Sequence, residues 1–198
     1  MTLNMLIGIL EQGLIYGIMA MGLLITYRIL DFPDLTVDSS FPLGAAVSAT
    51  LTLQGVAPWL TLLIGCAAGG IAGLITGLIH VKCRVRDLLS GIITMTGLYS
   101  INLHIAQNKA NLPLFGGDTL FRNAFTKSLP KAISPYTTLI IIILIALIAK
   151  ILLDLFLRTK CGYLLRAAGD NPSVVTTLSR DQGTVKILGL IIANALVA

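Results

Sequence analysis

The stretch RTKCGYLLRAAGDNPSVVTTLSRDQGTVK, residues 158–186, is a polar and charged segment that separates two apolar runs. The run before it, 136–157, is the most apolar part of the chain, and the run after it covers 187–198. A helix needs about 20 predominantly apolar residues to cross the hydrocarbon core of a bilayer, and the run at 136–157 meets that length. The segment is therefore expected at a membrane surface, between two spans.

This polar segment contains signals for a short helix of its own. The boundary signals are Gly169 as a break, Asp170 or Asn171 as the cap, Pro172 at the first helical position and Gly183 as the end. We therefore expect a helix over about 172–181. Such a helix either binds a soluble partner or rests on lipid headgroups as an ordinary amphipathic helix, and its pattern leaves both interpretations open.

The composition of the whole chain is that of a membrane protein. Of its 198 residues, 56% are hydrophobic and 12% are charged, whereas soluble domains carry about 25% charged residues. The mean hydropathy is +0.90. The net charge of +5 comes from Lys and Arg residues that lie almost entirely between apolar runs, which favours control of membrane topology over nucleic-acid binding. We predict an all-α polytopic membrane protein in which residues 1–198 form one transmembrane domain.

Three aspartates and two prolines fall close together between the first and second apolar runs. They are Asp31, Pro33, Asp34, Asp38 and Pro42. The prolines are expected to interrupt any helix here, and the run that follows, 41–53, is short for a full span. We therefore expect a discontinuous second helix near a solute pathway, or alternatively a solvated loop before a short tilted helix. No His or Cys accompanies the aspartates, so no metal site is predicted.

Two other apolar runs carry polar residues that can line a solute pathway. Glu11 lies in the first run, 3–27, where it either faces such a pathway or bonds a neighbouring helix. The run at 88–106 is unusually rich in hydroxyl and amide side chains, which favours a helix that faces water or other helices. Its pathway candidates are Thr94, Thr96, Ser100 and Asn102.

Small residues indicate where helices pack closely. The run at 58–79 repeats glycine at every fourth position, in Gly65, Gly69, Gly73 and Gly77. Gly13 and Gly17 form a shorter pattern of the same kind in the first run. Both patterns are typical of helix–helix contact.

Basic residues set the expected orientation in the membrane. The positive-inside rule places the loop at 80–87 in the cytoplasm, together with the segment at 158–186. Parity then puts the connection at 107–135 outside, and it puts Met1 outside if 41–53 crosses the membrane. The final run from Ile187 has only 12 residues, too few to span, so we expect the protein to continue beyond Ala198.

Three segments together resemble one family. They are EQGLIYGIMA at 11–20 with DFPDLTVDSSFPLGAAV at 31–47, GIITMTGLYSINL at 91–103, and GYLLRAAGDNP at 162–172. The chain is similar to the membrane-spanning permease subunits of bacterial ABC importers related to branched-chain amino-acid and ribose permeases, in a subgroup sometimes linked to aromatic amino-acid uptake. One position departs from the family pattern, because Ser39 stands where Gly is expected after Asp38.

The resemblance implies a definite set of partners. Two copies of the permease would pair in the inner membrane of a bacterium and dock two separate ATPase subunits. An extracytoplasmic binding protein would deliver the solute, expected to be an amino acid or a similar small molecule. This chain would bind no cofactor and would not be an enzyme, since ATP is used by the partner and no phosphate-binding Gly-x-x-x-x-Gly-Lys-Ser/Thr loop is present.

The resemblance also assigns roles to two segments. Residues 31–46 would form the broken helix near the pathway, with Asp31, Asp34 and Asp38 as candidates. Residues 162–181 would hold a cytoplasmic coupling helix that fits a groove on the ATPase. The coupling candidates are Gly162, Arg166, Gly169, Asp170, Asn171 and Pro172.

A second class of function remains open on the residues alone. An ion-coupled secondary transporter or channel would need no ATPase, and Glu11, Asp31 or His104 would then be candidates for ion coupling. A detectable inverted repeat would favour that class, and we find no convincing internal similarity. A membrane anchor without transport would leave the polar run at 88–106 unexplained.

Overall fold

The computed structural model describes residues 2–109, 112, 114, 119, 121, 136–170 and 181–198, with side chains from Met5 onwards. The elements in these ranges are all helices, which confirms the expected all-α class. In chain order they are α1 (Thr2–Leu23), the π-helix η1 (Leu24–Ile29), α2 (Val37–Leu53), α3 (Pro58–Lys82), α4 (Asp87–Ile105), α6 (Thr137–Leu157), α7 (Lys160–Asp170) and α9 (Gln182–Val197).

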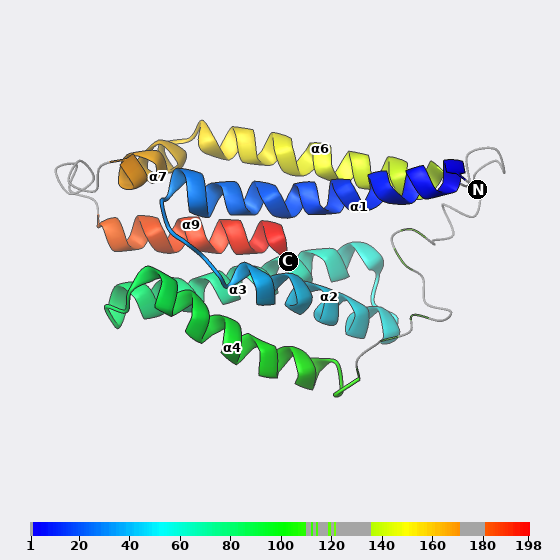
Figure 1. Cartoon of the computed structure of the whole chain (residues 1–198), viewed down its shortest axis with the longest axis horizontal. Coiled ribbons are helices and arrows are strands. Elements are labelled where there is room, and N and C mark those ends of the chain that lie inside the picture. The colour runs from blue at the N-terminus through cyan, green and yellow to red at the C-terminus, as the bar shows by residue number, and fades with distance from the viewer. Residues whose placement is uncertain are drawn as a thin grey trace.

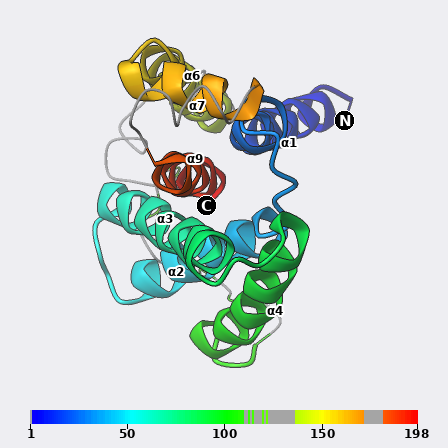
Figure 2. The ribbon, with the colours of Figure 1, turned by 90° about the vertical axis from the view of Figure 1, so that its left-hand side faces the viewer.

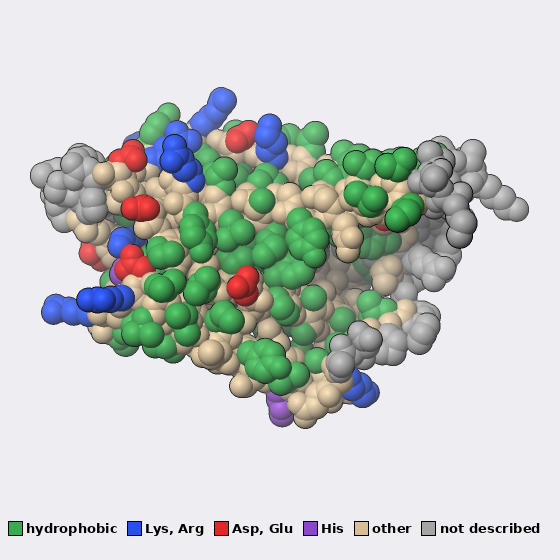
Figure 3. All heavy atoms as spheres, viewed as in Figure 1, with side chains coloured by type: hydrophobic (Ala, Val, Ile, Leu, Met, Phe, Trp, Pro, Cys, Tyr) green, Lys and Arg blue, Asp and Glu red, His purple; other side chains and the backbone are tan. Residues whose placement is uncertain are grey.

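Four helical stretches are long and apolar enough to cross a membrane. They are Met5–Ile29, Pro58–Lys82, Asp87–Ile105 and Thr137–Leu157. Large apolar side chains on their outer faces are exposed, such as Leu144 at 58% and Leu152 at 60% on α6. Figure 3 shows hydrophobic side chains covering the middle of the visible face, while Lys and Arg gather towards its left-hand end. This distribution confirms a multi-pass membrane protein.

The centre of the bundle is occupied by α9, which lies between the α1–α6 pair and the α2–α3 pair (Figures 1 and 2). Leu190 and Ala193 on α9 are fully buried. A Cβ on Gly22 of α1 would collide with the Ala193 carbonyl oxygen, so α1 and α9 approach closely. α9 comprises 16 residues, Gln182–Val197.

The glycine stripe on α3 is a packing surface, as predicted. A Cβ on Gly69 would collide with the Asn194 carbonyl oxygen, and one on Gly73 would collide with the Leu190 carbonyl oxygen. At Gly77 a Cβ would lie 3.1 Å from the Ile187 Cα. The stripe therefore lets the backbones of α3 and α9 touch. Gly13 and Gly17 differ, because nothing in the described part of the chain lies within 4 Å of a Cβ at either.

The backbone between η1 and α2 is irregular but buried in protein. Phe32, Asp34 and Thr36 are at most 1% exposed, so this non-helical stretch lies among helices and not in lipid. Pro33 falls in this stretch, as expected. The expectation for Pro42 is wrong, because α2 begins at Val37 and continues through Pro42. The discontinuity therefore lies before α2. Along the long axis of the bundle, α2 begins at a level part-way along α1 and not at the end of α1 (Figure 1).

The helix ends follow the expected parity. At the end of the bundle on the left of Figure 1, the chain leaves η1 and α3 and enters α4 and α9. The junction between α6 and α7 lies at the same end. The end of α4 and the start of α6 lie at the opposite end. Residues 80–87, 158–170 and 181–186 thus share one end, for which the positive-inside rule predicts the cytoplasm.

Asp181 caps the start of α9. Its carboxylate accepts hydrogen bonds from the Thr184 hydroxyl, at 2.9 Å, and from the Gly183 and Thr184 amides. Gly183 therefore lies in the first turn of α9, and its expected role as the end of a preceding helix is wrong. The expected helix over 172–181 lies outside the described residues, apart from Asp181.

We expect Asp181→Ala to lower the melting temperature near neutral pH. The hydrogen bonds from Thr184 and then Gly183 hold the pKa of Asp181 below its ordinary value. A carboxyl group with a lowered pKa stabilises the folded state above its ordinary pKa, and this contribution is lost as pH falls through the lowered value. Melting curves from pH 7 down to pH 3 should show the difference between wild type and variant shrinking; a constant difference would contradict the cap.

Candidate functional site

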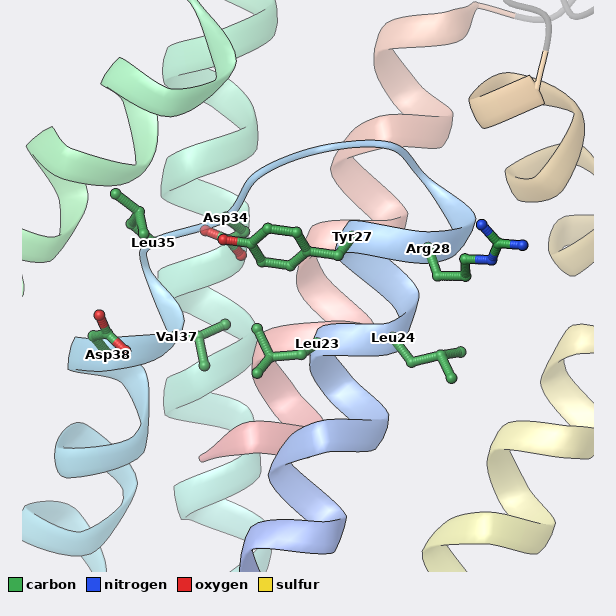
Figure 4. A pocket seen from close by; sticks show the side chains of 8 residues that line it. All are labelled: Leu23, Leu24, Tyr27, Arg28, Asp34, Leu35, Val37 and Asp38. Carbon is green, nitrogen blue, oxygen red and sulfur yellow. The ribbon is translucent and has the colours of Figure 1, made fainter.

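An open pocket of about 560 Å³ lies between η1, the irregular stretch and the start of α2 (Figure 4). Its lining residues are Leu23, Leu24, Tyr27, Arg28, Asp34, Leu35, Val37 and Asp38. In Figure 4 the Tyr27 ring points toward Asp34, whereas the Arg28 side chain points away from it, towards the other side of η1. The pocket thus has apolar walls with two carboxylates and one aromatic ring on one side.

The π-helix gives this pocket its wall. At the end of η1 the Leu30 amide donates to the Ile25 carbonyl, five residues back, and the Phe32 amide donates to the Thr26 carbonyl. The chain then turns at Asp31, whose φ is +52°, in the left-handed region that Asp tolerates better than most residues. These features direct Phe32 and Asp34 inward and leave Tyr27 at the surface, 48% exposed.

Asp34 is the centre of a buried polar network. One carboxylate oxygen accepts a hydrogen bond from the Thr36 amide at 2.9 Å, and the other accepts from Asn194 Nδ2 at 2.7 Å. The Asn194 carbonyl oxygen in turn accepts from the Ser40 hydroxyl at 2.8 Å. Asp34, Thr36, Ser40 and Asn194 are each at most 1% exposed. The network ties the irregular stretch and α2 to the central helix α9.

Three further contacts fix the start of α2. The Thr36 and Thr76 hydroxyl oxygens lie 2.8 Å apart, which joins the stretch to α3. On the other side, the Ser39 hydroxyl donates to the Met95 carbonyl at 3.0 Å, and Asn102 Nδ2 donates to the Ser39 carbonyl at 3.0 Å. Ser39, which stands where the family pattern has glycine, is therefore a normal helical residue that bonds α4.

The structure brings together only some of the predicted pathway residues. Asp34 and Asp38 line the same pocket, the first buried and the second exposed, and Asp31 is exposed beside them in sequence. Asn102 reaches the start of α2 through Ser39. Glu11 is half-buried on α1 and is not part of the pocket lining.

The hydroxyl residues of α4 are divided between two faces. Thr94 is buried, and its hydroxyl donates to the Ser90 carbonyl one turn earlier. Thr96 and Ser100 are exposed, and the Thr96 hydroxyl donates to carbonyl oxygens of its own helix. Intrahelical bonding satisfies Thr94 and Thr96 without a solute, so their presence in a span needs no pathway.

Four of the six coupling candidates lie on α7, at the basic end of the bundle. Gly162 is buried, and a Cβ on Gly169 would collide with the Ile29 carbonyl oxygen, so α7 packs directly on the end of η1. Gly169 is helical, and the expected break at this residue is therefore wrong. Arg166 and Asp170 are exposed. Asn171 and Pro172 lie outside the described residues.

His80 joins this basic end to the pocket stretch. Its Nδ1 lies 2.9 Å from the Val85 carbonyl oxygen and 3.3 Å from an Asp87 carboxylate oxygen. Its Nε2 lies 3.3 Å from Lys186 Nζ, in the second turn of α9. The ring also meets Phe32 edge to face, with centroids 5.2 Å apart. Contacts therefore run from Lys186 near the start of α9, through His80, to Phe32, which lies two residues before Asp34.

Several residues of this site were not predicted from the sequence. Asn194, Thr36, Ser40 and Thr76 form the network, and Tyr27 and Arg28 line the pocket. Asn194 had a detectable signal, because it is the only polar side chain in the apolar run at 187–198. A buried amide in a span needs a partner, and its presence predicts a polar network.

Comparison with known proteins identifies the family. Residues 5–198 match the model of the permease component of branched-chain amino acid transport systems. The tyrosine transport system permease protein of Clostridioides difficile is 43% identical over 193 residues, which are 98% of this chain and 61% of that protein. No solved structure matches the chain.

Two further relatives are more distant. An uncharacterised protein of Rickettsia prowazekii is 34% identical over 196 residues, covering 99% of this chain and 66% of that protein. A protein of Methanocaldococcus jannaschii named as a probable branched-chain amino acid transport permease protein, LivH, is 31% identical over 205 residues, covering 95% of this chain and 62% of that protein. The chain spans less than two thirds of the length of each of these relatives. Since the family model covers residues 5–198 of the 198-residue chain, the chain belongs to the family of permease components of branched-chain amino acid transport systems.

Proposed function

We propose that this chain is the membrane-spanning part of an ATP-driven importer in a bacterial inner membrane. Two copies would form the solute pathway, separate subunits would hydrolyse ATP, and an extracytoplasmic binding protein would deliver the solute. The observation that carries the proposal is the family match over residues 5–198. This chain would bind no cofactor itself.

We propose an amino acid as the solute. The name of the Clostridioides difficile relative makes tyrosine the first candidate. The full-length protein, reconstituted in vesicles with its ATPase and binding protein, should accumulate tyrosine only when ATP is supplied on the ATPase side. Accumulation driven by a proton or sodium gradient without ATP would instead establish a secondary transporter.

The helix α7 is the proposed docking element for the ATPase. Its Leu165 and Ala168 are buried against the bundle, while Arg166 and Asp170 face outwards. An exposed charged face on a helix that is packed firmly on η1 can transmit the movement of a partner to η1 and the pocket beside it. Basic residues at the same end favour the cytoplasmic side, where ATP is available.

We expect Arg166→Glu combined with Asp170→Lys to abolish co-purification of the ATPase. The two substitutions exchange the charges of the exposed face and leave the buried residues of α7 unchanged, so the permease should fold normally. Affinity purification in detergent, followed by quantification of the ATPase, measures the effect, and a loss of at least about tenfold is expected for two reversed charge contacts. Lys109→Glu, an exposed charge reversal after the end of α4, is the matched control. Equal recovery with wild type and the double variant would exclude α7 as the docking element.

A further inference from the structure

We propose that the pocket between η1 and α2 binds the ammonium group of the transported amino acid, with Asp34 as its buried anionic partner. This rests on the proposed function in one respect, the choice of an amino acid as the solute. The proposal assigns a chemical role to Asp34, Tyr27 and Asp38, and it places the apolar part of the solute against the leucine side chains of the pocket.

The charge of Asp34 is the first support. Its two oxygens receive one hydrogen bond each, both from uncharged donors, the Thr36 amide and Asn194 Nδ2. Among the described residues no ion pair is formed with Asp34, and Arg28, the cation in the pocket lining, points away from it (Figure 4). A carboxylate oxygen has two lone pairs, so each can accept one further hydrogen bond. A buried carboxylate without a cation is the environment that an incoming ammonium group completes.

The shape of the pocket is the second support. Its volume of about 560 Å³ suits a small solute, since ligand pockets occupy about 300–1,000 Å³. In Figure 4 the hydroxyl end of Tyr27 points toward Asp34, so the side of the pocket that holds the carboxylate also carries a hydroxyl group. Leu23, Leu24 and Leu35 supply apolar surface for a hydrocarbon side chain. The exposed Asp38 adds negative charge at the rim.

The backbone around the pocket is the third support. A π-helix, an irregular buried stretch and the start of a short helix meet here, and such interruptions mark ligand sites in many transporters.

A purely structural role for Asp34 makes a different prediction. Asp34 bonds the Thr36 amide at the start of α2, and this alone explains its burial if no ligand binds. Asp34→Asn separates the two roles. An amide can still accept from Thr36, and Asn194 can turn its amide to accept from the new NH₂ group while the Ser40 hydroxyl reverses its bond. This turn costs the bond that Asn194 Nδ2 donates to the Leu190 carbonyl at 3.1 Å. The bonds to Thr36 and Ser40 survive, but the charge is lost.

The experiment is ligand-induced thermal stabilisation of the full-length permease, purified alone in detergent. The probes are phenylalanine, phenethylamine, which lacks the carboxylate, and 3-phenylpropionate, which lacks the ammonium group, each up to about 10 mM. We expect phenylalanine and phenethylamine to raise the melting temperature of wild type and 3-phenylpropionate to leave it unchanged. Asp34→Asn should raise the half-saturating concentration of phenethylamine at least about tenfold, the effect of losing about 1.4 kcal/mol.

Several results would overturn the proposal. They are no stabilisation of wild type by phenethylamine, equal stabilisation by 3-phenylpropionate, or unchanged binding in Asp34→Asn. If Asp34→Asn does not fold, Leu23→Trp replaces it, because the Leu23 side chain lies on the side of the helix that faces Val37 (Figure 4), and a ring there should fill the pocket and abolish binding. Co-purification of the ATPase does not depend on the pocket, so its loss would count against the proposed function and not against this site.

Discussion

Replacing Asn194 by Leu is expected to lower the free energy of unfolding by about 2–4 kcal/mol, although Leu is apolar and similar in size. Asn194 is fully buried at the centre of the bundle and donates to Asp34 at 2.7 Å. Without that donor, one oxygen of a buried carboxylate faces hydrocarbon. The loss at Ser40 is smaller, because its hydroxyl also lies 3.3 Å from the Val37 carbonyl oxygen.

A double-mutant cycle isolates this effect. If the cost arises from stranding the carboxylate, Asn194→Leu should be less damaging in an Asp34→Asn background, with a coupling energy of about 0.5–3 kcal/mol. Unfolding in detergent and denaturant provides the four free energies. Gln12→Leu is the control, because it removes an exposed amide from α1. Strictly additive effects of the two substitutions would contradict the network.

The apolar runs and the glycine spacing predicted most of the fold. Both signals are local: the length of 136–157 identifies a span, and a glycine at every fourth residue of 65–77 produces a smooth helix face. What the glycines contact was not predictable, because α9 lies more than 100 residues further along the chain than α3. The partner depends on tertiary packing, which leaves no periodic pattern in either segment.

The wrong predictions concern residues whose local backbone preference did not decide where a helix begins or ends. Pro42 was expected to interrupt a helix, yet α2 continues through it because neighbouring helices hold its start through Ser39 and Asn102. Gly183 was expected to end a helix, but the cap at Asp181 places it in a first turn. Gly and Pro signal a change of backbone geometry, and the sequence alone does not say on which side of the residue it occurs.

The candidate site was predictable as a region but not as a set of contacts. The aspartates at 31–38 marked the pocket, and two of the three line it. Asp34 bonds Asn194 on α9, and the neighbouring Thr36 bonds Thr76 on α3; both helices are far from residues 31–38 in sequence. Long-range contacts made by His80 and Asn194 also link α9 to the stretch that lines the pocket.

Gly73→Ala is expected to destabilise the protein by about 1–3 kcal/mol, the cost of overpacking a close backbone contact. The new methyl group would collide with the Leu190 carbonyl oxygen, and a backbone atom cannot rotate away as a flexible side chain can. α3 and α9 would have to separate, and this movement would also stretch the Thr36–Thr76 contact, because Thr76 lies on α3 three residues after Gly73.

Gly70→Ala is the matched control for this substitution. Gly70 is also buried on α3, but a Cβ there would lie 3.6 Å from the nearest atoms, the Ala195 Cβ and the Ile191 Cγ2, which is ordinary contact. Alanine favours a helix over glycine by about 1 kcal/mol, so Gly70→Ala should be neutral or stabilising. Melting temperatures of the two variants measured side by side test the prediction. Opposite signs at two glycines only three positions apart would show that α3 is shaped by its contact with α9, whereas equal effects would mean that helix propensity alone determines both.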